Sequence, residues 1–284
     1  MTQFTYRYDG SFSGFLCCIF DSYVNREEPA HIFPPEEARL TLFEERRIVS
    51  DEAHAARVHR SLALRISPAA QKLVERGFCT CAPEREMLLY RFIRLGYEKG
   101  GAVLAALSHP DVAPLLEADR HMGGELQLLR GFVRFSELGG VLVSEIEPKN
   151  RVLPYLAPHF RARLPRERFL IYDRTHREAC VSEPGRWAIL PLEEFRMAAP
   201  DAREAAYRRL WRNFYDTVAI TERYNPKCRM THMPKRYWAC MTEFQGEASA
   251  PLPPENAAVS LRPAAPAATP GPATRPGPAR RAPA

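Results

Sequence analysis

The stretch FVRFSELGGVLVSEIEP, from Phe132 to Pro148, is where the hydrophobic pattern changes from helical spacing to the alternation of a strand. Apolar and polar residues alternate on both sides of Gly139-Gly140, and a glycine pair between two such runs is typical of a β-hairpin. Two further strand-like runs follow, FLIYDR at 169–174 and one through Trp187 to Leu190. Because the strands are joined by short Gly or polar links, the sequence predicts an antiparallel sheet.

Residues 51–130, which precede this sheet, are predicted to form a helical layer. Val58, Leu62 and Ile66 recur at four-residue steps, as they do along one face of a helix. Ser67-Pro68 then has the residues of a helix start, because serine caps the first turn and proline fits inside it.

The N-terminal residues are predicted to alternate strand and helix. Phe4, Tyr6 and Tyr8 alternate with polar residues ahead of a turn at Asp9-Gly10. The almost wholly apolar run 14–23 predicts a short buried helix, although a buried strand has the same pattern. A further strand is expected within 40–50.

Two helices are expected after the hairpin. Residues 155–163 have the length of about two helical turns. Residues 201–219 give the clearest amphipathic pattern of the chain, with one apolar stripe made by Tyr207, Leu210, Trp211, Phe214 and Val218. We expect this helix to end ahead of Asn225-Pro226, because the residue before a proline disfavours helical backbone.

These patterns predict an α+β fold, with a helical layer packed on an antiparallel sheet and a disordered C-terminal tail. Residues 1–246 are expected to form a single folded domain, in which 51–130 and 131–246 are candidate subdomains. Residues 247–284 contain 10 of the chain's 26 prolines, 12 alanines and no aromatic residue. A segment with so little apolar surface to bury is predicted to stay disordered.

The composition favours a cytoplasmic protein. It permits an acidic partner but does not require one. The 284 residues are 45% apolar and carry a net charge of +6. Seven cysteines, an odd number, indicate reduced thiols rather than a disulfide scaffold. The longest uninterrupted apolar run, 15–20, is far shorter than the roughly 20 residues that span a bilayer, so no membrane association is expected.

The segment YNPKCRMTHMPKRYWACMTEF at 224–244 has the composition of a nucleic-acid-binding surface. Four positive charges and no carboxylate lie between Lys227 and Trp238. Lysine and arginine contact phosphates, and exposed aromatic rings stack on bases. The candidate nucleic-acid-binding residues are Lys227, Arg229, His232, Lys235, Arg236, Tyr237 and Trp238, together with Arg163. The alternative is that Tyr237 and Trp238 belong to the core, with long cationic stems covering its edge.

No metal or cofactor site is predicted. Cys79 and Cys81, and the group Cys228, His232 and Cys240, lack the paired Cys-x-x-Cys spacing of a structural zinc site. Phosphate-binding glycine loops with Lys-Ser/Thr and the Gly-x-Gly-x-x-Gly pattern are also missing from the sequence, which argues against nucleotide hydrolysis and dinucleotide chemistry.

Four residues are candidates for acid and base catalysis: Asp9, Glu125, His159 and Asp173. Asp9 precedes a glycine, where a carboxylate most often makes an Asx turn. His159 and Arg163 lie four residues apart and can face a phosphate or carboxylate together, unless Arg163 instead pairs with Asp173. No nucleophile with an evident base is found.

Several strings of the sequence together resemble a bacterial family of probable DNA metabolism or DNA repair proteins of unknown activity. They are Tyr8-Asp9-Gly10-Ser11-Phe12 with the apolar run 14–23, Glu125 with Gly131-Phe132-Val133-Arg134-Phe135, His159-Phe160 with Arg163, Ile171-Tyr172-Asp173, and Asn225-Pro226 with Met233-Pro234-Lys235-Arg236-Tyr237-Trp238. The resemblance covers about 1–244. It implies a DNA repair setting, a radical-SAM protein as partner and an association with a uracil-DNA glycosylase-like protein. It implies no catalytic mechanism.

Three hypotheses follow from the sequence. The first is an accessory protein that binds DNA or another nucleic acid on the 224–244 surface while a partner does the chemistry. The second is an enzyme acting on a nucleobase or the sugar-phosphate backbone, which requires the four acid and base candidates to meet in one cleft. The third is a scaffold for the radical-SAM protein, which requires an exposed apolar patch.

Overall fold

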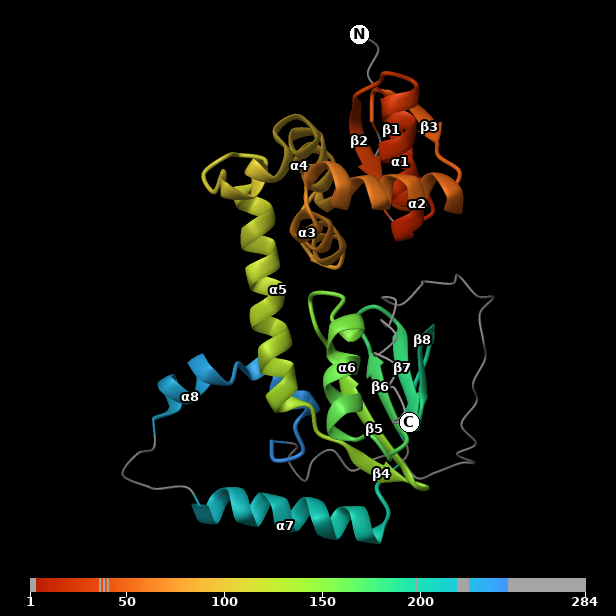
Figure 1. Cartoon of the computed structure of the whole chain (residues 1–284). Coiled ribbons are helices and arrows are strands. Elements are labelled where there is room, and N and C mark those ends of the chain that lie inside the picture. The colour runs from red at the N-terminus through yellow and green to blue at the C-terminus, as the bar shows by residue number, and fades with distance from the viewer. Residues whose placement is uncertain are drawn as a thin grey trace, which may run out of the picture.

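The computed structural model describes residues 4–35, 37, 39, 41–197, 199–218 and 225–244, with the side chains of 215, 216 and 226 excepted. The predicted tail at 247–284 lies outside these residues, as does Tyr224. The fold is α+β, as predicted, with a small sheet near the N-terminus, a group of helices and a second, larger sheet (Figure 1).

The N-terminal sheet consists of three parallel strands in the order β2-β1-β3. Strand β1 spans Phe4–Arg7, β2 spans Pro29–Phe33 and β3 spans Glu44–Arg47, which confirms the two predicted strands of this region. The helix α1, Phe12–Val24, connects β1 to β2, and its capping residue Ser11 accepts a hydrogen bond from Gly14 N. The apolar run is therefore a buried helix, since the crossover between parallel strands needs such a connection.

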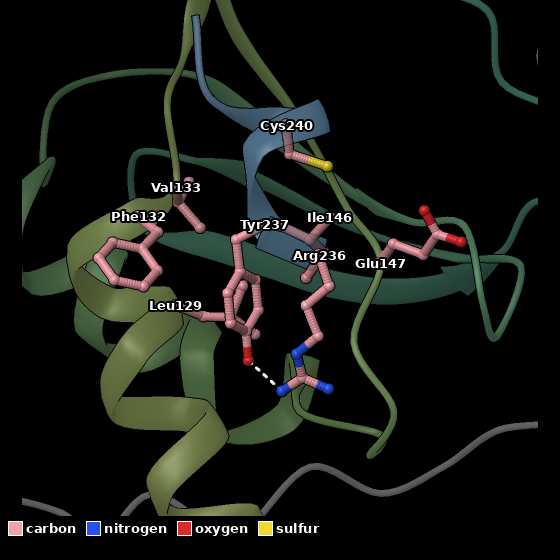
Figure 2. Close-up of a pocket in the computed structure, with 8 residues that line it drawn as sticks. All are labelled: Leu129, Phe132, Val133, Ile146, Glu147, Arg236, Tyr237 and Cys240. Carbon is pink, nitrogen blue, oxygen red and sulfur yellow. Dashed lines mark hydrogen bonds between the residues drawn. The ribbon is translucent and has the colours of Figure 1, made fainter. Parts of the chain in front are cut away.

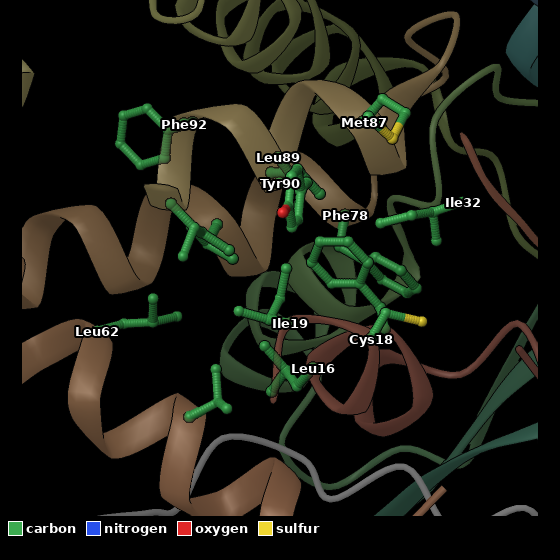
Figure 3. Packing of buried hydrophobic residues seen from close by; sticks show 14 of the residues in the cluster. Leu16, Cys18, Ile19, Ile32, Leu62, Phe78, Met87, Leu89, Tyr90 and Phe92 are labelled. Atoms are coloured by element: carbon green, nitrogen blue, oxygen red, sulfur yellow. The ribbon is translucent and has the colours of Figure 1, made fainter. Parts of the chain in front are cut away.

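The helical layer follows as α2 Glu52–Ser61, the π-helix η1 Leu62–Ile66, α3 Pro68–Phe78, α4 Arg85–Lys99, the 3-10 helix η2 Gly100–Ala105 and α5 Ala113–Phe132. Ser67 caps α3 by accepting from Ala70 N, with Pro68 in the first turn, as predicted. Figure 3 shows Ile19 of α1 between Leu62 of η1 and Phe78 of α3, and Phe92 of α4 belongs to the same buried cluster. This layer and α1 thus share one apolar core.

Gly77 and Gly124 lie in two of these helices in opposite surroundings. A Cβ at Gly77 would lie 2.7 Å from Leu115 Cδ1 and 2.8 Å from Leu89 Cδ2, both in fully buried side chains, whereas one at Gly124 would meet nothing within 4 Å. Overpacking a core costs about 1–3 kcal/mol, and replacing a helical glycine with alanine gains about 0.5–1 kcal/mol. We therefore expect Gly77→Ala to destabilise the protein by about 1 kcal/mol and Gly124→Ala to stabilise it by about 0.5–1 kcal/mol. Urea unfolding measures both, and shifts of the same sign would contradict the packing described.

The second sheet has the order β4-β5-β6-β7-β8. Its strands are β4 Ser136–Leu138, β5 Val141–Ile146, β6 Phe169–Asp173, β7 Glu178–Glu183 and β8 Arg186–Pro191. Three of its four pairings are antiparallel, as predicted. The β5–β6 pairing is parallel, which corrects the prediction. The reason is the helix α6, Leu153–Arg163, because it lies between these strands and makes the link long enough for a crossover.

Helix α5 ends later than the alternating pattern suggests. The run from Phe132 was predicted to be strand from its first residue, but α5 continues through Phe132 and β4 begins at Ser136. Leu115 near the start of α5 packs in the N-terminal core, whereas Met122 and Leu126 pack in a second core with α6 and the larger sheet. The one helix therefore contributes to both cores.

The amphipathic helix α7 spans Ala202–Val218, close to its predicted bounds. It begins beside β4, where Glu137 N donates to Glu204 Oε2 over 3.3 Å and Arg208 Nη2 donates to Ser136 Oγ over 2.5 Å. Beyond this point its apolar stripe is exposed: Tyr207 55%, Leu210 64%, Trp211 41%, Phe214 56% and Val218 60%. Figure 1 shows α7 set apart from the larger sheet and α6.

Two short helices follow, α8 Pro226–His232 and the 3-10 helix η4 Lys235–Cys240. The second begins directly after Pro234, which is its N-cap residue. None of the helices in the described part of the chain is both long and apolar enough to cross a membrane.

Candidate functional site

The predicted nucleic-acid-binding segment is here called the C-terminal strip and comprises residues 225–244. Asn225 caps α8 by accepting a hydrogen bond from Cys228 N over 3.0 Å, with Pro226 in the first turn. Near the end of the strip, the buried Glu243 pairs over 2.7 Å with Arg134, which lies two residues after the end of α5. Local capping thus shapes the strip, and a long-range ion pair anchors its end.

Trp238 and Phe244 form an aromatic pair in the strip. Their ring centroids lie 4.6 Å apart with an interplanar angle of 18°, and Trp238 Nε1 donates to the Met233 carbonyl over 3.0 Å. The Arg229 guanidinium carbon lies 5.1 Å from the Trp238 ring centroid, and Lys235 Nζ lies 5.9 Å from it. Both rings stay partly exposed. The pair is therefore a preformed aromatic surface with cations beside it.

Tyr237, by contrast, is a core residue. Its side chain is 3% exposed and packs against Phe132 of α5, with ring centroids 5.5 Å apart (Figure 2). Burial and the nearby Glu125 carboxylate raise the pKa of the Tyr237 hydroxyl. The cavity beside it holds only about 10 Å³, which is the size of about one water molecule. The prediction that Tyr237 stacks on a base does not fit this burial, and the alternative of a core residue describes it.

Arg236 points to a carboxylate rather than to solvent alone. Its Nη2 lies 2.9 Å from Glu125 Oε1 and also donates to the Tyr237 hydroxyl. Glu125 is 2% exposed and further accepts from Lys149 N over 3.0 Å, Asn150 N over 2.8 Å and Asn150 Nδ2 over 2.6 Å. The arginine thus neutralises a buried carboxylate, while the residue itself is exposed, so its predicted contact with a phosphate stays a prediction.

Asn150 was missed by the sequence reasoning. It is 1% exposed, and its Oδ1 accepts from Cys81 N over 3.0 Å while its Nδ2 also lies 3.3 Å from His121 Nδ1. It therefore connects α5, the β5–α6 link and the loop that follows α3. The only sequence signal that could have identified Asn150 is weak, because it is a polar residue shortly after a predicted strand in a segment without a motif.

Lys227, Lys235 and Arg236 are exposed cations of the strip, and within the described part of the chain Arg236 is the one with an acidic partner, Glu125. Among the described residues, no carboxylate lies within ion-pair distance of either ammonium group. His232 is exposed as well. The strip is accordingly divided. Tyr237 is buried, the exposed Arg236 reaches inward to Glu125, and Lys227, His232, Lys235 and part of the Trp238–Phe244 pair face outward.

The enzyme hypothesis requires the four acid and base candidates to meet in one cleft, and the structure does not bring them together. Asp9 lies beside α1 and accepts from Ser11 N over 2.9 Å, which is the Asx turn considered above, and from Ser50 Oγ over 2.6 Å. Burial raises its pKa, but these hydrogen bonds outweigh burial and leave the pKa lowered. Asp173 is fully buried and accepts from Thr175 N and from both backbone and ring nitrogens of His176, so the ion pair with Arg163 is not formed.

His159 lies in a positively charged cluster with Arg130 of α5 and Arg163 of α6. Its Nε2 and the Arg130 Nε are both buried and lack hydrogen-bond partners in the described part of the chain. Desolvation and then the charges of Arg130 and Arg163 lower the pKa of His159 below its ordinary value of 6.5. Neither Glu125, Asp9 nor Asp173 contacts this cluster within the described residues.

This shift predicts a pH dependence of stability. Because the pKa of His159 is lower in the folded state than in the unfolded chain, protons bind preferentially to the unfolded chain. The neutral His159 side chain therefore contributes to stability above about pH 6.5, and this contribution is lost as the pH falls. When the pH falls from about 7.5 to about 5, we expect the unfolding free energy to decrease less for His159→Gln than for the wild type. Urea unfolding at both pH values measures this, and parallel pH profiles for the two proteins would contradict it.

A shallow depression of about 400 Å³ lies where α5 faces η4. It is lined by Glu117, Arg120, His121, Gly124, Glu125, Leu128 and Arg236. Six of these residues come from one face of α5, and Arg236 comes from the strip. The depression therefore lies directly beside the strip.

The cysteines bring no further chemistry into this region. All seven are free thiols, and burial raises the pKa of Cys79 and of Cys240 to about 11 in each case. Among the residues that the structure describes, no three His, Cys, Asp or Glu side chains gather as a metal-binding group.

Comparison with known proteins gives one match. A family model described as a domain of unknown function, DUF4130, matches residues 83–243. No curated protein and no solved structure matches the chain. The matched segment runs from the loop before α4 to the end of the strip and includes Glu125, Asn150 and Arg236, so it holds the depression and most of the strip. Because it spans more than half of the sequence, the chain belongs to the DUF4130 family of domains of unknown function.

Proposed function

We propose that the protein is an accessory nucleic-acid-binding protein of DNA metabolism and repair, which acts in the cytoplasm and holds a strand on the C-terminal strip. The observation that carries the proposal is the partly exposed Trp238–Phe244 pair next to Lys227 and Lys235, two ammonium groups without an acidic partner among the described residues. The DNA setting rests on the family resemblance.

The arrangement favours single-stranded over duplex nucleic acid. Aromatic side chains stack on bases that are free of a partner strand, and nearby cations follow the phosphates. The Trp238 ring is fixed by its hydrogen bond to Met233 and by Phe244, so little side-chain freedom is lost on binding. Arg229, close to both rings, adds a third cation to Lys227 and Lys235.

The salt dependence of binding tests this proposal. Three phosphate contacts give a slope of log K against log salt of about −2 for a single strand, at about −0.7 for each contact. We expect Lys227→Ala/Lys235→Ala to reduce the slope to about −0.7. Fluorescence anisotropy with a labelled oligothymidylate, measured over a salt series, gives both values.

The matched control is Lys72→Ala/Lys99→Ala, which removes the same charge from exposed positions of the helical layer. It is expected to leave the slope unchanged. Absent or salt-insensitive binding by the wild type, or equal effects of the two double variants, would refute the proposal.

A second function, that of a protein-interaction scaffold, is favoured by a different observation. The five large apolar side chains of the α7 stripe are all more than two-fifths exposed, and surfaces of this kind mark protein contacts. We propose that this stripe contacts the radical-SAM protein expected from the family resemblance. A uracil-DNA glycosylase-like protein is the alternative partner.

Co-expression tests the scaffold. Phe214→Glu is expected to abolish co-elution of the radical-SAM protein in gel filtration, because it places a charge in the stripe. Asn213→Glu, at an exposed α7 position outside the stripe, is expected to leave co-elution intact. Co-elution that survives Phe214→Glu, or that requires nucleic acid, would exclude this role of α7.

A further inference from the structure

We propose that the depression between α5 and Arg236 holds one nucleotide unit, with its base against Gly124 and Leu128 and its phosphate at Arg120 and His121. This inference rests on the proposed function for its source of ligand, which is a residue of the strand bound on the strip. The same chemistry is offered by a free mononucleotide, so the experiment below separates these two sources.

The size and shape of the depression suit such a unit. Its volume of about 400 Å³ falls within the roughly 300–1,000 Å³ of typical ligand sites. It is open to solvent, so a strand can lie across it. Its floor is firm, because Glu125 and Arg236 are fixed by their ion pair and by the hydrogen bonds from Lys149 and Asn150.

Gly124 supplies an independent observation. Glycine in a helix interior costs about 0.5–1 kcal/mol relative to alanine, so its presence there normally has a packing reason, as for Gly77. No such reason exists at Gly124, where a Cβ would meet nothing within 4 Å. What the missing side chain does provide is bare helix backbone in the wall of the depression, on which a planar ring can lie with Leu128 beside it.

The charges around the depression suit a phosphate at one end. Arg120 and His121 are exposed and lie one turn of α5 before Gly124. The carboxylate of Glu125 does not repel an anion strongly, because Arg236 neutralises it and three N–H groups donate to it. Glu117 is the opposing charge, about one turn before Arg120 and His121 on the same helix face, so the two cationic or polar side chains have to outweigh it at the phosphate.

The depression also continues into the strip. Arg236 lines the depression, and its neighbours Lys235 and Trp238 belong to the outward-facing part of the strip. A strand stacked at Trp238 can therefore place an adjacent nucleotide against Gly124. This continuity favours a strand residue over a free nucleotide.

Filling the depression tests the inference. We expect Gly124→Leu to weaken binding of a short oligothymidylate by about 5- to 100-fold, which corresponds to the loss of one stacked base. Gly124→Ala, whose methyl group covers part of the bare backbone, is expected to bind with an affinity between those of the wild type and Gly124→Leu, whereas Gln127→Leu, at an exposed α5 position outside the lining, is expected to bind like the wild type. Equal affinity of Gly124→Leu and wild type for the oligonucleotide would overturn the inference while leaving the proposed function intact.

Calorimetric titration with thymidine 5′-monophosphate and with 2-deoxyribose 5-phosphate separates the sources. If the mononucleotide binds more tightly than the sugar phosphate, and Gly124→Leu removes that difference, the depression takes a nucleotide even without a strand. If the wild type binds the oligonucleotide but neither small molecule, and Gly124→Leu weakens the strand, the source is the strand. Failure of the wild type to bind any of the three probes would overturn both the inference and the proposed function.

Discussion

Glu125→Ala is expected to destabilise the protein by about 3–5 kcal/mol, because the carboxylate it removes is buried, pairs with Arg236 and is the acceptor of three further N–H groups. The loss extends beyond the ion pair. Lys149 N, Asn150 N and the Asn150 amide would also lose their acceptor, and unsatisfied buried donors are costly. Urea unfolding followed by tryptophan fluorescence suits this test, because all three tryptophans, Trp187, Trp211 and Trp238, lie within residues 83–243, the segment that also contains this network.

Glu117→Ala is the matched control, since it removes an exposed glutamate two turns earlier on the same helix. It is expected to change the unfolding free energy by no more than about 0.5 kcal/mol. Glu125→Gln keeps the shape of the side chain but removes its charge, and should lie between the two. A cost below about 1 kcal/mol for Glu125→Ala would mean that the carboxylate is solvated, and Glu125 would return as a candidate acid or base.

Tyr237→Ala is expected to cost about 3–5 kcal/mol, the usual price of truncating a buried aromatic residue. Its ring fills the space between α5 and β5, against Phe132, Leu129 and Ile146 (Figure 2). Arg236 would lose its hydroxyl contact in addition. The same unfolding experiment measures this loss.

Tyr207→Ala makes the comparison direct, because Tyr207 is 55% exposed on α7. This control is expected to stay within about 0.5 kcal/mol of the wild type. A Tyr237→Ala variant that is equally stable but binds single-stranded DNA poorly would show that the ring faces the ligand, which is the original prediction from the sequence. Since Glu125 and Tyr237 share Arg236, their costs should not add in the double variant.

The two predictions bear on function as well as on stability. Tyr237 belongs to the inner side of the strip, and Glu125 of α5 holds the strip through Arg236, so the loss of either residue would weaken nucleic-acid binding indirectly, through the fold. Lys227 and Lys235 belong to the outer side, and their substitution should change binding while sparing stability. This difference separates the residues that hold the strip in place from those proposed to contact a strand.

Local signals in the sequence determined most of the secondary structure. The Ser67-Pro68 cap, the apolar run of α1 and the alternation through β4 and β5 each act over a few residues, and the structure contains all three elements. The same is true of the bounds of α7, because a stripe with helical spacing is a property of one segment alone. The α+β class follows from the order of these elements.

Tertiary structure alone decided which groups face each other and which faces stay exposed. The parallel β5–β6 pairing depends on how α6 crosses the sheet, and the meeting of Glu125 with Arg236 depends on the docking of η4 against α5. Likewise, composition gave Tyr237 and Trp238 the same role, whereas packing buries the first and leaves the second partly exposed. The physical reason is that backbone propensity and hydrophobic period act between near neighbours, while burial and ion pairing join segments that are distant in the chain.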